Sequence, residues 1–471
     1  MKHDLAKRLR GKISTTPEDL ACYGFDASGL EGAPSAVVWP ADLQDVVEII
    51  DYARSNRIPV IPRGAGTGMT GGAVPDTSPV AGLHNGTDTV PGTRQRKHAI
   101  VMSFEQMNRI LEIDRENMQV LVEPGVINGA LQLELARFGL FYPPDPASMN
   151  FCTIGGNVAE NAGGPRALKY GVTRDYVMGL EAVLPDGSVI HTGVRTSKGV
   201  VGYDLTRLLV GSEGTLAVVT KIRLKVLPVP EDVITLLVLF KDIEESGNTV
   251  SAIISGGIVP RTLEFMDSEA IRAVENYKPV GLPVDVEALL LIELDGDPVV
   301  IKKEAEKISY ICAQHGGEII MAEDDAAREK IWESRRALSP ALYHLMPTKI
   351  NEDIVVPRNR ISQMLRKLKT LSAESGIKII NFGHAGDGNI HVNIMVDKND
   401  KPAYSKATEL VKEVFRTTLD LGGTISGEHG VGLTKMAYIG MEIKPAELEL
   451  MKRIKQAFDP LNILNPGKIF P

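Results

Sequence analysis

Apolar residues recur at helical spacing over residues 43–56, and short apolar runs lie on either side of this stretch. The periodicity predicts an amphipathic helix from Leu43 to Asn56. The flanking runs, Ser35–Trp39 and Ile58–Ile61, have the length of strands. The residues expected on the buried face of the helix are Val46, Val47, Ile49, Ile50 and Ala53. The pattern therefore predicts a strand, helix and strand unit near the N-terminus.

A glycine-rich segment follows this unit: Pro62–Gly72 reads PRGAGTGMTGG and contains five glycines. Glycine adopts positive φ readily and leaves backbone N–H groups uncovered, which suits a phosphate or pyrophosphate. The segment is not a Rossmann fingerprint, because Pro75 opposes the long helix that such a motif opens. No Gly-Lys-Ser/Thr closes it, so it is not a Walker loop either. Its composition would also fit a flexible linker, but its place after a strand, helix and strand favours a nucleotide-binding loop.

Two further glycine groups lie downstream, at Thr153–Gly164 (TIGGNVAENAGG) and Leu209–Thr220 (LVGSEGTLAVVT). Taken singly, each is also compatible with an ordinary turn. Separated glycine groups suit a dinucleotide, because different loops can bind its pyrophosphate and its ring system. The regular elements expected in this half are strands Ala99–Phe104 and Gln119–Glu123, a helix Asn128–Arg137 and a strand–turn–strand over Gly179–Thr192.

The composition changes at Val226–Pro230 (VLPVP), which predicts a domain boundary. Beyond it, strands and helices alternate without glycine loops, a pattern typical of an α+β module with an antiparallel sheet. The expected strands are Val233–Phe240, Thr262–Met266, Ala288–Leu294 and Glu318–Met321. The expected helices are Pro298–Gln314, Ala326–Leu345 and Arg360–Ala373.

The second chemical region begins with Lys378–Met395, which reads KIINFGHAGDGNIHVNIM. Two extended runs flank a Gly-Asp-Gly turn, which is a hairpin signal, so we expect His384 and His391 to face each other across the connection. Alternation along a strand then sets Asn393 on the same face as His391.

A carboxylate and another histidine follow in GTISGEHGVG, as Glu428 and His429. Two histidines and one carboxylate can form a three-ligand site for a divalent cation with open positions for substrate or water. Because neighbouring side chains in an extended segment point in opposite directions, Glu428 could bind a metal while His429 reaches toward substrate. The alternative is that these are hydrogen-bonded polar residues in a glycine-rich turn.

Composition excludes several other classes. The chain has 471 residues, enough for two or three domains. A formal net charge of -8 and the lack of a basic stripe argue against a nucleic-acid partner. Three widely spaced cysteines indicate neither a disulfide framework nor a cysteine metal cluster, which favours a reducing compartment. The apolar runs are too short to cross a bilayer, and the basic N-terminus has no apolar signal core, so we expect a cytoplasmic protein.

One stretch interrupts the pattern of the first half. Pro75–Lys97 is rich in Pro, Gly and Thr without any period and predicts an inserted surface loop. The histidines of this region, His84 and His98, are expected to be solvated.

Six segments together resemble a known family: PRGAGTGMTGG, TIGGNVAENAGGPRALKYGVTRDYV, VGSEGTLAVVT, FGHAGDGNIHVN, SGEHGVG and FDPLNILNPGK. They are similar to the FAD-dependent D-2-hydroxyacid dehydrogenases of the glycolate oxidase and D-lactate dehydrogenase type. That family belongs to the vanillyl-alcohol oxidase superfamily. The resemblance extends from about Ser35 to Lys468.

The resemblance implies an α+β protein with a two-subdomain FAD-binding domain and an α+β cap domain that contains an antiparallel sheet. We expect the FAD-binding domain at 1–228, the cap and substrate or metal domain at 229–415, and a C-terminal segment at 416–471 that returns to the FAD domain. Two departures from the family are the longer insertion after Val74 and Ala217, which stands where a glycine is common.

The resemblance also implies site residues. The metal ligands would be His384, His391 and Glu428, the general base His429, and the substrate-side residues Arg335, Asn393 and Lys349. A planar guanidinium such as that of Arg335 suits a substrate carboxylate. The FAD contacts would be Arg63, Gly64, Ala65, Gly66, Thr67, Met69, Thr70, Gly71, Pro144, Thr153, Gly156, Asn157, Asn161, Gly163, Tyr170, Gly171, Glu213, Gly214 and Asn465.

The implied activity is oxidation of a D-2-hydroxy acid, D-lactate or glycolate, to the 2-oxo acid. The implied cofactors are FAD and a divalent metal, for which zinc, manganese and iron are all suitable. Covalently flavinylated relatives carry a histidine where this chain has Gly66-Thr67-Gly68, so the FAD should be noncovalent.

The partner expectations are a small-molecule 2-hydroxy acid, an electron acceptor such as an iron–sulfur protein or an electron-transferring flavoprotein, and a second copy in a homodimer. Through such an acceptor the chain would be peripheral to the inner membrane. Two alternative functions stay open: an electron-transfer flavoprotein subunit that oxidises no substrate itself, and a metal-dependent hydrolase, which would leave the glycine groups unexplained.

Overall fold

The computed structural model describes residues 5–75 and 98–471, which form two units. Unit 1 lies within 1–162, 172–228 and 428–471, and unit 2 comprises 163–171 and 229–427. The long segment of unit 2 begins at Val229, and the chain returns to unit 1 at Glu428. This return is later than the expected 416, because helix α13 (Lys401–Asp420) packs on strands of unit 2. The predicted insertion lies outside the described residues, apart from Pro75.

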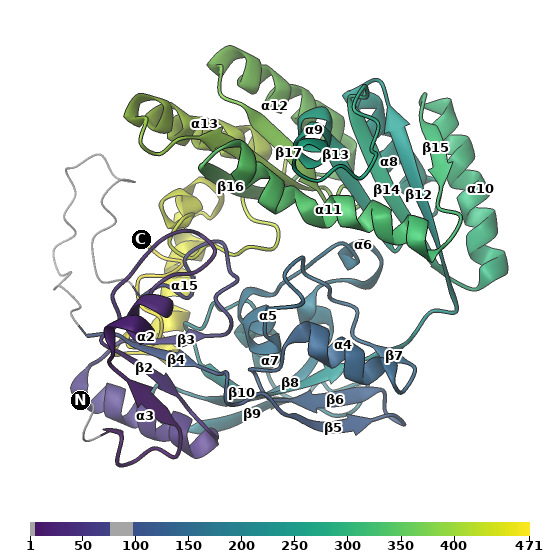
Figure 1. The fold of residues 1–471 in the computed structure, drawn as a ribbon. Helices are drawn as coiled ribbons and strands as arrows, with labels where there is room; N and C mark the ends of the chain where they lie inside the picture. Colours follow the sequence, from purple (N-terminus) through teal and green to yellow (C-terminus); the bar gives the residue numbers. More distant parts are fainter. Residues whose placement is uncertain (1–4, 76–97) are drawn as a thin grey trace. The chain divides into compact units, whose positions relative to one another are not determined.

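The N-terminal part of unit 1 is built on a four-stranded sheet in the order β1-β2-β4-β3 (Figure 1). β2, β4 and β3 are parallel, and β1 pairs antiparallel with β2. The predicted helix is confirmed with the same bounds, because Asp42 caps its first turn and its apolar face packs into the core. The elements of this part are β1 (Lys12–Ser14), α2 (Pro17–Cys22), β2 (Ala36–Trp39), α3 (Leu43–Asn56), β3 (Val60–Arg63) and β4 (Ile100–Ser103).

A five-stranded antiparallel sheet, in the order β5-β6-β10-β8-β9, forms the second part of unit 1. Its strands are β5 (Ile110–Asp114), β6 (Gln119–Val122), β8 (Val177–Val183), β9 (Val189–Gly193) and β10 (Val218–Lys225). The other elements are α4 (Asn128–Ala136), β7 (Leu140–Phe141), α5 (Ile154–Glu160), η1 (Thr173–Asp175), α7 (Leu205–Leu209) and β11 (Leu227–Pro228). The second glycine group is therefore largely helical as α5, capped by Thr153 and ended by Asn161 in the left-handed region.

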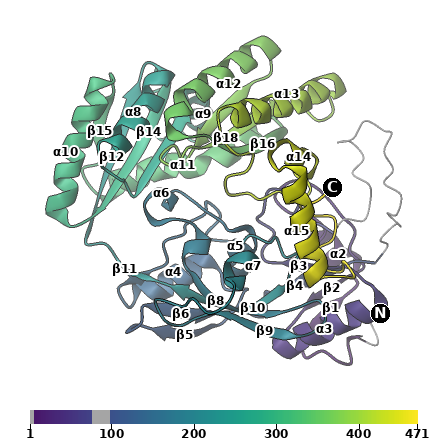
Figure 2. The same cartoon turned by 180° about the vertical axis from the view of Figure 1, so that it is seen from behind.

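The C-terminal segment returns to the first sheet of unit 1 (yellow in Figure 2). It contains η3 (Met436–Tyr438), α14 (Ile439–Glu442) and α15 (Pro445–Phe458). Beyond α15, Leu464 forms a parallel bridge with Val60, and the backbone N–H of Asn465 donates to the carbonyl of Val60 at 2.8 Å. The last residues of the chain therefore lie beside the strand that leads into the Pro62–Gly72 loop.

Unit 2 is built on a seven-stranded antiparallel sheet in the order β15-β12-β14-β13-β17-β18-β16 (Figure 1). Its strands are β12 (Asp232–Phe240), β13 (Thr262–Asp267), β14 (Ala288–Gly296), β15 (Glu318–Met321), β16 (Thr348–Val355), β17 (Ile379–Gly383) and β18 (Asn389–Val396). Its other helices are α6 (Ala167–Tyr170), α8 (Ile243–Ser255), α9 (Ser268–Tyr277), α10 (Pro298–Gln314), α11 (Asp325–Leu345), η2 (Arg358–Arg360) and α12 (Ile361–Ser375).

The core of unit 2 includes one apolar face of this sheet, on which α9 and α11 pack. Leu237, Met266 and Phe382 contribute to that face from three different strands. β13 also carries Glu264, and His384 follows β17; both residues belong to the site described below. The predicted antiparallel α+β module is confirmed, as is the hairpin formed by β17 and β18.

Candidate functional site

A cavity in unit 1 is lined by the first two glycine groups and by residues of the third. The first two groups approach closely: a Cβ at Gly64 would lie 2.3 Å from Oγ1 of Thr153. At Gly66, where φ is +71°, a Cβ would meet the guanidinium of Arg63. Backbone rather than side chain therefore borders the cavity at these positions, which is the surface that a pyrophosphate needs.

Most of the predicted FAD contacts line this cavity, and some do not. Those that do are Arg63, Gly64, Ala65, Gly66, Thr67, Met69, Thr153, Gly156, Asn157, Glu213 and Gly214. Those that lie elsewhere are Thr70, Gly71, Pro144, Asn161, Gly163, Tyr170, Gly171 and Asn465. Of these, Gly163, Tyr170 and Gly171 belong to unit 2. Among the cavity residues that sequence analysis missed are Gly68, Ser148, Glu160 and Leu209.

Glu213 and Asn465 hold the backbone around the cavity. The carboxylate of Glu213 accepts hydrogen bonds from the N–H groups of Val431 at 2.8 Å and Gly432 at 2.7 Å. The amide of Asn465 donates to the carbonyl of Gly72 at 2.9 Å and to that of Glu213 at 2.8 Å. These contacts join the first and third glycine groups to the C-terminal segment.

Glu160, at the end of α5, has a buried carboxyl that lines the cavity. Burial raises the pKa of Glu160 well above its usual value, and the nearby carboxylates of Glu213 and Asp26 act in the same direction. Its Oε2 atom is buried and has no hydrogen-bond partner among the residues that the structure describes. A bound cofactor with polar atoms would satisfy this buried oxygen, so the chemistry of the lining fits FAD.

The histidine hairpin in unit 2 has the predicted arrangement. His384 follows β17 and His391 lies on β18, and their rings meet edge to face with centroids 5.1 Å apart. Both side chains are buried, with residue exposures of 5% and 6%. Asn393 follows on the same face of β18 and is fully buried.

Each histidine has a carboxylate near its Nδ1 atom. For His384 this is Glu264, with Oε1 at 2.6 Å, and for His391 it is Asp353, with Oδ1 at 3.6 Å. Burial by itself raises the pKa of Glu264, but the charges of His384 and Arg335 outweigh it and leave the pKa below its usual value. An ionised Glu264 accepts a hydrogen bond from Nδ1 of His384, which fixes the tautomer of this imidazole.

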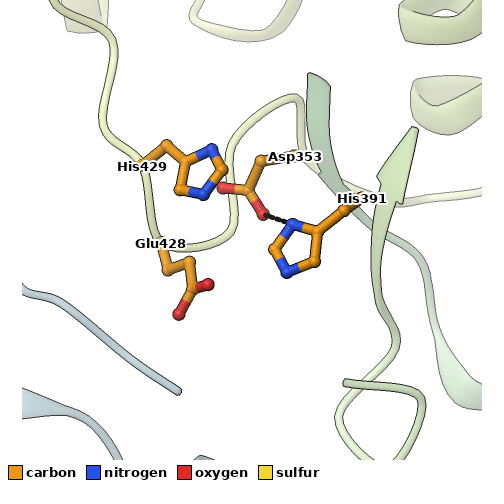
Figure 3. A group of neighbouring side chains, drawn as sticks. All are labelled: Asp353, His391, Glu428 and His429. Atoms are coloured by element: carbon orange, nitrogen blue, oxygen red, sulfur yellow. Dashed lines mark ion pairs between the residues drawn. The ribbon is translucent and has the colours of Figure 1, made fainter. Parts of the chain in front are cut away.

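Asp353 was missed by sequence analysis because no motif surrounds it. Its position follows only from strand pairing, in which it stands opposite His391 on β16. Oδ1 accepts from Nδ2 of Asn389 at 2.6 Å, and Oδ2 accepts from the N–H of Gly427 at 3.0 Å. Figure 3 shows Asp353 and His391 with the ion pair between them dashed, and labels Glu428 and His429, which follow Gly427 along the chain.

Glu428 and His429 begin the C-terminal segment of unit 1 and both line its cavity. The carbonyl of His429 accepts a hydrogen bond from Oγ1 of Thr70 at 3.1 Å. Thr70, a predicted FAD contact, therefore holds the backbone of the predicted base.

The predicted substrate-side residues lie in unit 2 and have partners there. Nε of Arg335, on α11, donates to Oε2 of Glu264 at 2.6 Å. Oδ1 of Asn393 accepts from Nδ2 of Asn351 at 2.7 Å. Nζ of Lys349 donates to Oγ of Ser339 at 2.8 Å, and burial lowers the pKa of Lys349 to about 8.

The comparisons with known proteins identify the family of this chain. Residues 229–469 match the family described as "FAD linked oxidases, C-terminal domain", and residues 34–82 and 76–193 match "FAD binding domain". The chain therefore belongs to the FAD-linked oxidases and is an FAD-linked oxidoreductase. This confirms the family resemblance and the predicted fold class.

Two named relatives cover nearly the whole chain. The glycolate oxidase subunit GlcD of Bacillus subtilis is 43% identical over 452 residues, which are 95% of this chain and 92% of that protein. The D-lactate dehydrogenase of Anaerostipes hadrus is 35% identical over 465 residues, which are 96% of this chain and 92% of that protein. A solved structure, 4-ethylphenol oxidase from Gulosibacter chungangensis, has a TM-score of 0.77 at 19% identity and covers 98% of this chain and 94% of that one, a likeness of fold alone.

Within the described part of the chain, no helix combines the length and the apolar character needed to span a bilayer.

Proposed function

We propose that this chain is a dehydrogenase that uses noncovalently bound FAD to oxidise a D-2-hydroxy acid, with D-lactate or glycolate as substrate. The names of its relatives, which include a glycolate oxidase and a D-lactate dehydrogenase, support this substrate class. The observation that carries the proposal is the pair of buried histidines, His384 and His391, each with a carboxylate near Nδ1. Metal-binding histidines commonly have such a carboxylate, which fixes the tautomer and orients the ring.

The proposed metal ligands are His384, His391 and Glu428. The two histidines belong to unit 2, and Glu428, which belongs to unit 1, enters this set from the family resemblance. Imidazole and carboxylate donors suit zinc, manganese or iron. Glu264 would orient His384 through a hydrogen bond of 2.6 Å, whereas Asp353, at 3.6 Å from Nδ1 of His391, would act on that ring through its charge.

The proposed reaction separates a hydride from a proton. When bound, FAD supplies the hydride acceptor and the metal supplies positive charge that lowers the pKa of the substrate hydroxyl. His429 accepts the hydroxyl proton as general base, and Arg335 binds the substrate carboxylate through guanidinium nitrogens other than the Nε that Glu264 occupies. Asn393 and Lys349 complete the substrate side. None of Gly66, Thr67 and Gly68 is a histidine, the residue that carries the flavin in covalently flavinylated relatives, which supports noncovalent binding.

The word "subunit" in the names of the GlcD relatives supports a further element of the proposal, namely that another protein would accept the electrons of the oxidation. An iron–sulfur protein or an electron-transferring flavoprotein would serve. A second copy of this chain in a homodimer stays a prediction.

The test is anaerobic mixing of the metal-replete protein with D- and L-2-hydroxy acids while flavin absorbance is followed at about 450 nm. One D-acid is expected to bleach the wild-type protein, whereas H429A stays yellow and unbleached. Undiminished bleaching of H429A would remove His429 from the role of base. A yellow wild-type protein that no acid bleaches would favour the electron-transfer function, and a colourless one would contradict the cofactor.

A further inference from the structure

Glu264, on β13, is a fully buried carboxylate that contacts one imidazole and one guanidinium group. Oε1 lies 2.6 Å from Nδ1 of His384, and Oε2 lies 2.6 Å from Nε of Arg335. His384 follows β17 and Arg335 comes from α11, so one side chain joins two elements of unit 2. Each oxygen serves one partner.

A buried carboxylate is costly unless its charge is balanced and its oxygens are hydrogen-bonded. Glu264 meets both conditions through His384 and Arg335. Removing its charge would therefore affect both partners together: the imidazole would lose the anion that favours a proton on Nδ1, and the guanidinium would lose the anion that holds it. The ring of Phe382, 4.8 Å from Cζ of Arg335, supports the guanidinium from another direction but carries no charge.

We propose that Glu264 is a positioning residue that couples the affinity for the metal to the affinity for the substrate carboxylate. This inference rests on the proposed function, in which His384 is a metal ligand and Arg335 binds substrate. One ionised carboxylate presents Nε2 of His384 and orients the guanidinium of Arg335. The two binding events consequently share one supporting group, although their direct contacts differ.

A second buried glutamate provides a matched control. Glu293, on the neighbouring strand β14, is 3% exposed and accepts a hydrogen bond from Nε1 of Trp332, on the same helix as Arg335, at 2.6 Å. Oγ1 of Thr235 donates to the same oxygen at 3.0 Å. E293Q therefore removes a buried charge beside α11 without changing the group that contacts His384.

The experiment compares full-length wild type, E264Q and E293Q, each loaded with FAD. The affinity for Zn²⁺ or Mn²⁺ is measured by competition with a chromogenic chelator, and KM for the D-acid is measured at saturating metal. We expect E264Q to bind the metal roughly 10–100-fold more weakly, as found for other residues that support metal-binding histidines, and to have a KM raised about tenfold. E293Q is expected to match wild type in both, and equal flavin content checks the FAD domain in all three.

E264D is a second variant, which keeps the charge but shortens its reach. Because it can bond only one partner well, we expect it to lose either metal affinity or substrate affinity but not both. It also keeps the test available should E264Q be insoluble. A wild-type protein that binds metal, with E264Q and E264D indistinguishable from E293Q, would overturn the coupling alone. A wild-type protein that binds neither metal tightly would overturn the metal part of the proposed function and the coupling with it.

Discussion

A Cβ atom at Gly64 would lie 2.3 Å from Oγ1 of Thr153, closer than any side chain tolerates. Thr153 cannot move away freely, because the same oxygen accepts a hydrogen bond from the N–H of Gly156 at 3.1 Å and caps α5. The backbone of Gly64 and the side chain of Thr153, about ninety residues apart in sequence, are thus in contact at the wall of the cavity. The glycine there is required by packing, since its own φ lies outside the left-handed region.

Replacing Gly64 by Ala should therefore reduce FAD binding. The added methyl group must displace either the loop or the cap of α5, and we expect the Kd for FAD to rise at least about tenfold, the equivalent of 1.4 kcal/mol. Flavin fluorescence on titrating apoprotein with FAD measures this. The matched control is G440A, because a Cβ at Gly440 meets no atom within 4 Å. Equal affinities in the two variants would contradict the close approach.

Replacing Asn465 by Ala should destabilise unit 1. Asn465 is 1% exposed, and its amide donates to the carbonyls of Gly72 and Glu213. Leaving two buried acceptors unsatisfied costs about 1–3 kcal/mol each, so we expect a lower temperature of flavin release on heating. Q456A, at an exposed position on α15, serves as the control. An N465A protein that releases flavin at the same temperature as Q456A would show that the C-terminal return does not stabilise the cavity.

The lowered pKa of Lys349 predicts a pH dependence. With a pKa of about 8, the side chain is a cation below that pH and neutral above it. If the cation helps to bind the substrate carboxylate, kcat/KM for the D-acid should fall as pH rises through about 8. K349R should lose this alkaline limb, because a guanidinium stays protonated throughout the range. Identical pH profiles for wild type and K349R would remove Lys349 from substrate binding.

Two different roles can be assigned to Tyr170, and a substitution distinguishes them. The family resemblance implies a contact with FAD, whereas the structure places its hydroxyl 2.7 Å from Oδ2 of Asp295, within unit 2. From that contact we expect Y170F to keep the FAD affinity of wild type within about twofold and to lose about 1.5–3 kcal/mol of stability in unit 2, the usual range for a hydrogen bond to a charged group. FAD titration and thermal unfolding measure the two effects. Y310F, at an exposed tyrosine on α10, is the control. A tenfold weaker affinity for FAD would support the contact with the cofactor instead.

Local patterns predicted the regular elements well. The helix over residues 43–56 has its predicted bounds because both signals are local: an aspartate that caps the first turn and an apolar period of one helical face. The histidine hairpin was predictable for the same reason, since His384 and His391 are separated by a Gly-Asp-Gly turn within a single segment.

Packing decided where the patterns were ambiguous. The group TIGGNVAENAGG has the composition of a loop, yet most of it forms α5. A Cβ at Gly155 would lie 2.6 Å from Cβ of Pro124, so that glycine permits a helix to approach another segment closely. Composition alone does not distinguish this use of glycine from a flexible loop.

The sequence by itself determined the family, the two kinds of domain, the glycine groups and the histidines, because each is written in a continuous stretch of residues. Only the tertiary structure decided which carboxylates serve those histidines. Glu264 is 120 residues from His384, and Asp353 meets His391 only through the register of β16 and β18. A buried charged side chain is stable only where partners in space balance its charge. Strand pairing brings those partners together from distant segments, and the local pattern of each segment contains no sign of the contact.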